Sequence, residues 1–249
     1  MANFEISCKH VKVPNGDLQI SSYIAYPVCE GTFPAIVILQ EIFGVNAHIR
    51  EVTERIASEG YVAIAPALYQ RLAPDFEIGY TAEDVELGRR YKEQTQASEL
   101  LGDIQAAIAY LKSQSFVKGD ALGCIGFCFG GHVAYLAATL PDIKATASFY
   151  GAGITTWTPG SGQPTLARTS EIAGTLYAFF GNQDGSIPSP AVEQIEAELQ
   201  KHHISHRVFV YDGAEHGFFC DRRASYNPAA AADAWIQVKE LFSQVLQAV

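Results

Sequence analysis

The chain has 249 residues, of which 48% are hydrophobic, and its formal net charge is −10. This composition predicts a globular protein with a large buried core and excludes an extended disordered chain. The acidic balance and the absence of a Lys/Arg-rich segment disfavour nucleic acid and anionic membranes as partners. We expect residues 1–249 to form a single domain, since one α/β domain can hold a chain of this length.

The first predicted elements are two strands that form a hairpin. Residues 4–13 and 18–26 alternate polar and apolar side chains on either side of Pro14, Asn15 and Gly16. A period of two indicates half-exposed strands, and Asn-Gly is typical of hairpin turns. We therefore expect the fold to begin with an antiparallel pair.

Six short apolar runs follow the hairpin, and segments with helical periodicity separate them. Continuous apolar runs of this length favour strands that are buried on both faces, as in a parallel sheet. The alternation predicts an α/β fold, with a mostly parallel central sheet and helices on both of its faces. The runs cover residues 35–39, 61–65, 121–127, 145–150, 175–180 and 207–211.

The predicted helices have recognisable ends. Residues 48–59 stop at Gly60, and Ser189-Pro190 and Asn227-Pro228 each have the pattern of an N-cap followed by the first helical residue. A further helix is indicated by the apolar spacing of Leu100, Ile104, Ile108 and Leu111. Residues 152–173 are rich in Gly, Ser, Thr and Pro, which predicts a long loop that forms part of a pocket wall.

The cysteines and the apolar segments indicate where in the cell the protein is expected. The five cysteines are an odd number without metal-like spacing, and the first residues lack the apolar centre of a signal peptide. We therefore expect free thiols and a cytoplasmic protein, with no metal site. Residues 121–140 carry no Asp, Glu, Lys or Arg, but four glycines interrupt them, so we predict a strand, a turn and a helix rather than a membrane span.

The sharpest chemical motif is Gly126-Phe127-Cys128-Phe129-Gly130-Gly131. It follows an apolar strand and precedes a helical pattern over residues 132–140, which is the context of a G-x-S-x-G nucleophile elbow with cysteine in place of serine. Cys128 would then lie at the positive end of a helix dipole, which favours its thiolate. The alternative is a glycine-rich turn that carries a buried structural cysteine.

Two further residues complete a possible triad. Asp184 follows the apolar run 175–180, and His216 follows the run 207–211 in a glycine-flanked loop. A nucleophile needs a base, and the base needs a carboxylate that orients it. Folds with a nucleophile elbow of this kind supply them in the chain order nucleophile, acid, histidine. Taken singly, Asp184 could be a turn residue and His216 a surface residue. We interpret two other candidates, Cys124 and His132, as core residues.

The sequence resembles the dienelactone hydrolase family, the carboxymethylenebutenolidases, over nearly its whole length. The resemblance is carried by residues 40–46, 65–69, 126–131 and 181–184, and by His216-Gly217-Phe218. It implies an α/β-hydrolase fold and a cofactor-free enzyme that converts dienelactone, a carboxylated unsaturated lactone, to maleylacetate. In such an enzyme Cys128 would attack the lactone carbonyl, and the backbone N–H groups of Ile42 and Phe129 would form the oxyanion hole.

The resemblance also implies roles for a glutamate and for arginines. Glu41 would contact the thiol of Cys128 in the resting enzyme, and arginines would bind the carboxylate of the substrate. We expect Arg89 and Arg222 to be these arginines. Three others remain open as alternatives, namely Arg71, Arg90 and Arg223.

Other functions remain open at this stage. The same triad could serve a general carboxylesterase or a thioesterase, and an activated Cys128 could act as a thiol-reactive or redox sensor. A binding protein that retains the fold is disfavoured by the complete set of nucleophile, acid and base. We expect a small lactone or ester as the partner, no nucleic acid, no membrane, and a monomer or small homo-oligomer.

Overall fold

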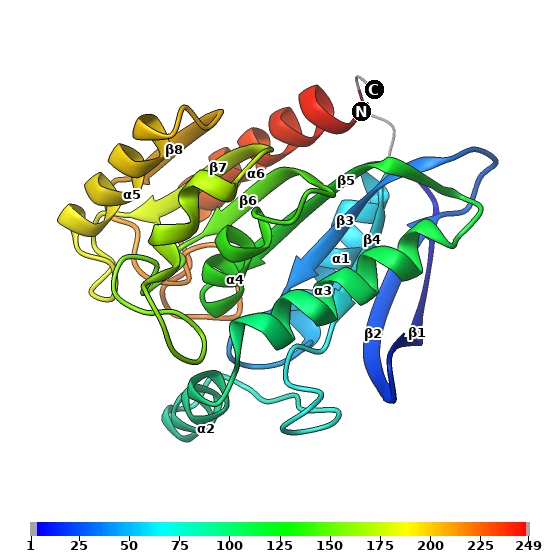
Figure 1. Cartoon of the computed structure of the whole chain (residues 1–249), viewed down its shortest axis with the longest axis horizontal. Helices are drawn as coiled ribbons and strands as arrows, with labels where there is room; N and C mark the ends of the chain where they lie inside the picture. The colour runs from blue at the N-terminus through cyan, green and yellow to red at the C-terminus, as the bar shows by residue number, and fades with distance from the viewer. Residues whose placement is uncertain (1–3, 248–249) are drawn as a thin grey trace.

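A mixed sheet of eight strands forms the centre of the molecule in the computed structural model, which describes residues 4–247 (Figure 1). The strands lie in the order β1-β2-β4-β3-β5-β6-β7-β8. The six strands from β3 to β8 run parallel, and the N-terminal pair is antiparallel. The bounds are β1 Ile6–Asn15, β2 Leu18–Pro27, β3 Phe33–Leu39, β4 Val62–Pro66, β5 Val117–Phe127, β6 Ile143–Phe149, β7 Thr175–Gly181 and β8 His206–Tyr211.

The N-terminal hairpin agrees with the prediction from sequence. Asn15 pairs with Leu18, so Gly16 and Asp17 form a two-residue loop. The φ angle of Gly16 is +60°, a conformation that glycine adopts without strain and that such tight hairpin turns require. β2 then pairs with β4 in the antiparallel sense, which joins the hairpin to the parallel strands.

Strand β3 shows why the apolar runs are continuous rather than alternating. Ile36 and Ile38 pack in the same cluster as residues of helices α1 (Ala47–Ser58) and α6 (Pro228–Phe242). Val37 and Leu39 pack in the cluster that holds residues of helix α3 (Ala97–Lys112). Because successive side chains point to opposite faces, a strand that is covered on both sides must be apolar at every position. The predicted parallel sheet between two helical layers is therefore present.

The helices cover both faces of the sheet (Figure 1). α1 (Ala47–Ser58) and α6 (Pro228–Phe242) lie on one face, and η2 (Ser243–Gln247) continues the C-terminal end. The other face carries α3 (Ala97–Lys112), α4 (Phe129–Ala137) and α5 (Ser189–Lys201). Helix α2 (Ala82–Glu93) lies apart from these layers, and its Gly88 packs so closely on the backbone oxygen of Ile42 that a Cβ atom there would lie 2.4 Å away.

Three details differ from the sequence-based expectations. α4 begins at Phe129, directly after the candidate nucleophile, rather than at residue 132. Pro188, not Ser189, occupies the cap position of α5, because its extended backbone makes Ser189 the first helical residue. The predicted loop 152–173 contains a short 3₁₀-helix, η1 (Thr165–Glu171). The predicted cap of α6 is confirmed, since Oδ1 of Asn227 accepts a hydrogen bond from the Ala230 N–H.

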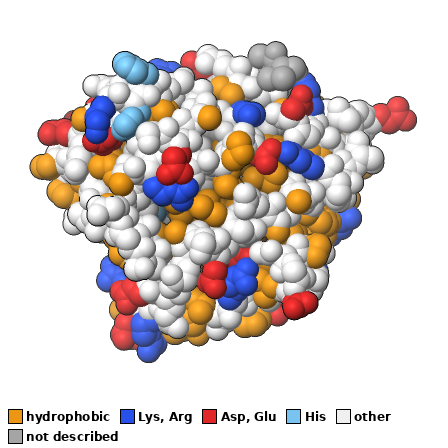
Figure 2. Space-filling model, viewed as in Figure 1, with side chains coloured by type: hydrophobic (Ala, Val, Ile, Leu, Met, Phe, Trp, Pro, Cys, Tyr) orange, Lys and Arg blue, Asp and Glu red, His pale blue; other side chains and the backbone are white. Residues whose placement is uncertain are grey.

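The charge-free segment 121–140 forms the end of β5 and then α4. Among the helices of residues 4–247, none combines the length and the apolar character that crossing a membrane requires. All five cysteines are free thiols, as predicted. On the face drawn in Figure 2, Lys and Arg side chains lie singly and several adjoin Asp or Glu, so that face carries no continuous basic stripe.

Candidate active site

Cys128 lies at a sharp turn between β5 and α4. Its φ and ψ angles are 55° and −115°, a strained conformation for a residue with a side chain. The neighbouring glycines make this turn possible, because a Cβ atom on Gly126 would lie 1.9 Å from the oxygen of Gly130, and one on Gly130 would lie 2.1 Å from the oxygen of Leu39. The strain and the close packing present the sulfur at the start of α4, where the helix dipole stabilises negative charge.

The sulfur of Cys128 contacts His216, which in turn contacts Asp184, so the three predicted triad residues lie together. Nε2 of His216 lies 3.1 Å from Sγ of Cys128, and Nδ1 of His216 lies 2.7 Å from Oδ2 of Asp184. Oδ1 of Asp184 accepts a hydrogen bond from the Ser186 N–H, which fixes the carboxylate. The structure thus brings together three residues that are far apart in the sequence, and it places them after β5, β7 and β8.

The electrostatics of His216 favour its charged form. Burial opposes a charged imidazole, but the neighbouring Cys128 and Asp184 outweigh burial and raise the pKa of His216 to about 10. A protonated imidazole beside the sulfur can stabilise a thiolate and can later deliver its proton to a leaving group. The arrangement can therefore perform nucleophilic chemistry at an acyl carbon.

The two residues predicted to supply oxyanion donors lie in the wall of the cavity. Ile42 and Phe129 both line the cavity that contains Cys128. Phe129 is the first residue of α4, so its N–H belongs to the set that a helix leaves without an internal acceptor. Within residues 4–247, neither the Ile42 N–H nor the Phe129 N–H donates a hydrogen bond. Both groups are free to bind an oxygen that develops negative charge.

Glu41 pairs with an arginine rather than with the thiol. Its Oε1 accepts a hydrogen bond from Nη1 of Arg223 at 2.9 Å, while Oε2 is buried without a partner among the described residues. No hydrogen bond within residues 4–247 joins Glu41 to Cys128, although the resemblance implies that contact for the resting enzyme. Arg223 also lies over the ring of Phe43, 5.7 Å from its centroid.

The cavity at Cys128 has a volume of about 350 Å³, which suits a small molecule. Three cationic side chains line it, namely Arg89, Lys92 and Arg223. Arg89 was predicted from the sequence. Arg222, the other predicted arginine, pairs with Glu51 and lines not this cavity but a second pocket, which His216 and Arg223 also line.

Lys92 was missed by the sequence analysis, although a signal for it exists. Val85, Arg89 and Lys92 are spaced by four and three residues, so they share one face of α2, and all three line the cavity. Nζ of Lys92 also lies 4.5 Å from the ring centroid of Trp157. Trp157 and Ala152 belong to the predicted pocket-wall loop, and Ala152 itself lines the cavity.

The residues interpreted as core are confirmed as such. Cys124 is fully buried, and burial raises its pKa to about 12. His132 is also fully buried, and its two ring nitrogens contact the Ala152 oxygen at 2.9 Å and Oγ1 of Thr165 at 2.7 Å. His48 is also buried, with a ring nitrogen within 4.8 Å of a carboxylate oxygen of Glu41, and burial lowers its pKa.

Comparisons with known proteins agree with one another. The model of the Dienelactone hydrolase family matches residues 20–246. A protein of Synechocystis sp. named "Putative carboxymethylenebutenolidase" is 57% identical, over 98% of this chain and 99% of its own length. A Bradyrhizobium protein named "Probable 2-oxo-3-(5-oxofuran-2-ylidene)propanoate lactonase" is 30% identical, over 89% of this chain and 87% of its own. The crystal structure of a "Putative Dienelactone Hydrolase" from Klebsiella pneumoniae superposes with a TM-score of 0.87, at 28% identity, over 96% of this chain and 99% of that one.

Proposed function

Because the chain belongs to the dienelactone hydrolase family and has the α/β-hydrolase fold, we propose that it hydrolyses a small carboxylated lactone through a triad of Cys128, His216 and Asp184. The observation that carries the proposal is the 3.1 Å contact between Sγ of Cys128 and Nε2 of His216, inside a cavity with cationic walls. Dienelactone is the substrate that fits the family best, and maleylacetate would be its product.

The proposed reaction proceeds through an acyl-enzyme. The Cys128 thiolate attacks the lactone carbonyl, and the backbone N–H groups of Ile42 and Phe129 stabilise the resulting oxyanion. When the C–O bond of the ring breaks, His216 gives its proton to the departing oxygen. A water molecule, deprotonated by the now neutral His216, then attacks the thioester and restores the Cys128 thiolate. Asp184 orients His216 throughout.

The cationic wall of the cavity supports a substrate with a carboxylate. Arg223 is the strongest candidate for binding it, because the planar guanidinium can form two parallel hydrogen bonds to a carboxylate. Its contacts with Phe43 and Glu41 hold the guanidinium in the wall of the cavity that contains Cys128. Arg89 and Lys92, which lie on α2, add positive charge to the wall of the same cavity. A neutral ester would gain nothing from these three residues.

Glu41 has a proposed role in controlling the nucleophile. In the proposed cycle, the thiol of the resting enzyme gives its proton to Glu41 as the substrate binds. In the structure, Glu41 is hydrogen-bonded to Arg223, and the sulfur of Cys128 contacts His216. This arrangement is the one expected once Glu41 has turned away from the sulfur. Such control would protect the thiolate from oxidation when no substrate is bound.

The proposal is tested by a hydrolysis screen of paired substrates. Each pair consists of a small lactone or ester with a carboxylate and the same compound as a neutral amide or methyl ester. We expect turnover of the carboxylated lactones and much lower kcat/KM for their neutral partners. Equal activity on both members of each pair, or preference for acyl thioesters, would contradict the proposed substrate class.

A further inference from the structure

Glu41, His48 and Cys220 form a buried cluster behind the candidate active site. One atom able to bind a metal from each residue lies within 4.8 Å of the corresponding atoms of the other two. All three residues are buried. They come from three separate places in the fold: the segment after β3, the first turn of α1, and the loop after β8. Spacing along the sequence could not indicate this cluster, because its members lie far apart in the chain.

Two polar atoms of the cluster lack a hydrogen-bond partner among the described residues. Oε2 of Glu41 and Nε2 of His48 are buried without hydrogen-bond partners among the described residues. The sulfur of Cys220 contacts the hydroxyl of Tyr80 at 3.4 Å, a weak hydrogen bond. Native proteins leave few buried polar atoms without partners, and each such atom calls for an explanation. Two of them in one cluster indicate a ligand at that position.

We propose that Glu41, His48 and Cys220 bind a zinc ion. Imidazole nitrogen, thiolate sulfur and carboxylate oxygen are the ligands that zinc takes in proteins, whereas calcium and magnesium prefer oxygen alone. Tetrahedral zinc holds its ligand atoms roughly 3.3–3.8 Å apart. Because the three atoms already lie within 4.8 Å of one another, only a small contraction is needed as the ion enters. The thiol of Cys220 releases its proton to solvent as the sulfur–zinc bond forms. Two anionic ligands then balance the charge of the ion.

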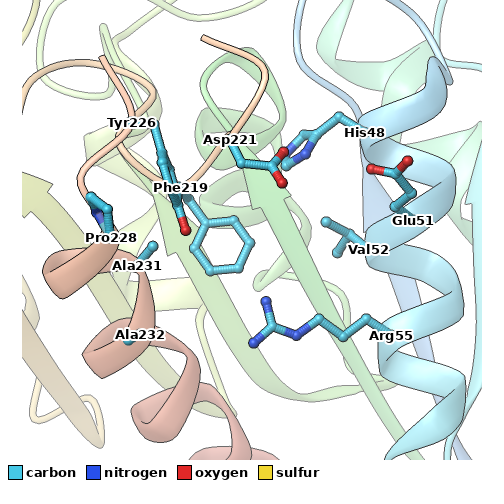
Figure 3. A pocket seen from close by; sticks show the side chains of 10 residues that line it. All are labelled: His48, Glu51, Val52, Arg55, Phe219, Asp221, Tyr226, Pro228, Ala231 and Ala232. Atoms are coloured by element: carbon cyan, nitrogen blue, oxygen red, sulfur yellow. The ribbon is translucent and has the colours of Figure 1, made fainter. Parts of the chain in front are cut away.

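A surface pocket that is separate from the substrate cavity reaches one member of the cluster, His48. The pocket has a volume of about 260 Å³, and His48 is one of its lining residues. Figure 3 shows it between α1 and α6, with His48 and Asp221 together at one end and Arg55 at the other. A metal-bound histidine usually gives its other ring N–H to a carboxylate, and Asp221 stands on the side of His48 that faces the pocket.

The ion would act on the reaction through Glu41, and this consequence rests on the proposed function. Glu41 cannot both bind zinc and exchange a proton with Cys128. Zinc would also weaken the hold of Glu41 on Arg223, which is the proposed carboxylate-binding residue. We therefore infer that zinc bound at this cluster inhibits hydrolysis.

Metal binding is tested with the full chain carrying Cys128→Ala, because Cys128 and His216 could themselves bind a metal. Titration with Co²⁺ is followed by optical absorption, since a thiolate ligand produces charge-transfer bands, and Zn²⁺ binding is measured by calorimetry. We expect one ion per chain. Adding His48→Gln or Cys220→Ala should lower the affinity at least about tenfold. Adding Cys29→Ser, which removes an exposed thiol outside the cluster, should change nothing.

Two results would contradict the proposed zinc site. One is the absence of saturable binding to the Cys128→Ala protein. The other is the persistence of charge-transfer bands after His48→Gln and after Cys220→Ala. Should Cys220→Ala fail to fold, as judged by circular dichroism, X-ray absorption of the zinc-loaded Cys128→Ala protein replaces it. That spectrum should contain one sulfur ligand, and a coordination sphere without sulfur contradicts the assignment.

Inhibition is measured separately on the chain with Cys128 intact. Zinc should inhibit hydrolysis, a chelator should restore it, and His48→Gln should weaken the inhibition while leaving zinc-free turnover unchanged. Equal inhibition of the His48→Gln protein would place the inhibitory ion at Cys128 and overturn the inference. If Cys128→Ala retained full hydrolysis, the proposed function would fail, while the binding measurements would still decide the metal site.

Discussion

Nη1 of Arg223 donates a hydrogen bond to Oε1 of Glu41 at 2.9 Å, which ties the loop after β8 to the segment after β3. β5, β6 and β7 lie between these two strands in the sheet, so the ion pair joins two segments that the strand order separates. The side chain of Glu41 is 1% exposed and that of Arg223 is 20% exposed. Removing either partner leaves a buried charge behind.

The first prediction compares Arg223 with its neighbour. Arg223→Gln should lower kcat/KM for a carboxylated lactone roughly ten- to hundredfold, because a charge-assisted hydrogen bond is lost. It should also destabilise the fold by roughly 3–5 kcal/mol, because the buried carboxyl group of Glu41 loses its ion-pair partner. Arg222→Gln is the matched control and should change both quantities little, since its partner Glu51 is at the surface. Steady-state kinetics and urea unfolding measure the two effects.

The double variant Arg223→Gln with Glu41→Gln separates charge from packing. It should recover most of the stability that Arg223→Gln loses, because no buried charge remains unpaired. A double variant as unstable as the single one would show that Arg223 stabilises the fold through packing on Phe43 instead.

The second prediction concerns the nucleophile. Cys128→Ala should lower turnover by roughly three or more orders of magnitude without loss of the fold, because the triad acts as a unit. Cys124→Ala, in the strand that leads to the turn, is the control: it should lower stability through a small cavity but keep kcat near wild type. Near-normal turnover by Cys128→Ala would refute the assignment of the nucleophile.

The third prediction concerns Glu41. Glu41→Gln should slow kcat roughly tenfold or more while KM changes less, because an amide cannot accept the proton of the thiol. Iodoacetamide labelling of Cys128 checks the same step. Labelling of the free enzyme should be slow, and a carboxylated substrate analogue that leaves the sulfur accessible should accelerate it. Fast labelling that the analogue leaves unchanged, apart from steric protection, would exclude control by Glu41.

The fourth prediction follows from the raised pKa of His216. The folded value is about 10, whereas an unperturbed histidine has a pKa of about 6.5. Proton binding to His216 therefore stabilises the fold fully below about pH 6.5, and this contribution disappears as the pH rises through about 10. Urea unfolding across that range should show a decline in stability that His216→Gln lacks and that Asp184→Asn reduces, because Asp184 contributes to the raised pKa. Identical pH profiles for all three proteins would contradict the charge interaction.

The fifth prediction tests the tight turn at the nucleophile. Gly126→Ala should destabilise the protein by at least about 2 kcal/mol, because the added methyl would lie 1.9 Å from the oxygen of Gly130. Gly119→Ala is a control in the same strand, where the nearest atom, Cγ of Lys112, lies at an ordinary 3.7 Å. Comparable unfolding midpoints for the two variants would mean that the turn relaxes at little cost.

The features that sequence predicted well are those that depend on local pattern. The strands were recognisable because a sheet that is covered on both faces requires uninterrupted apolar runs, as in Ile36 to Leu39. The position of Cys128 was recognisable because the tight turn leaves room only for glycine at Gly126 and Gly130. Asp184 and His216 followed from the rule that parallel strands collect side chains at their carboxyl ends.

The features that sequence could not determine depend on distant contacts. Arg222 and Arg223 are neighbours in sequence, and only the course of the loop after β8 decides which guanidinium faces Glu41. Ser189 resembled an N-cap, but the extended backbone of Pro188 moved the start of α5 by one residue. The approach of His48 to Cys220 depends on how α1 packs against that same loop.

The arrangement of the cavity also affects how such an enzyme can change over evolution. The sulfur, the imidazole and the aspartate stand at the ends of sheet strands, whereas Arg89 and Lys92 stand on α2, outside the layers that cover the sheet. Mutations that lengthen, shorten or recharge α2 can therefore alter which molecules are accepted while the reacting atoms keep their places. Descendants of one ancestral gene could diversify their substrates through this single helix and still inherit an intact reaction centre.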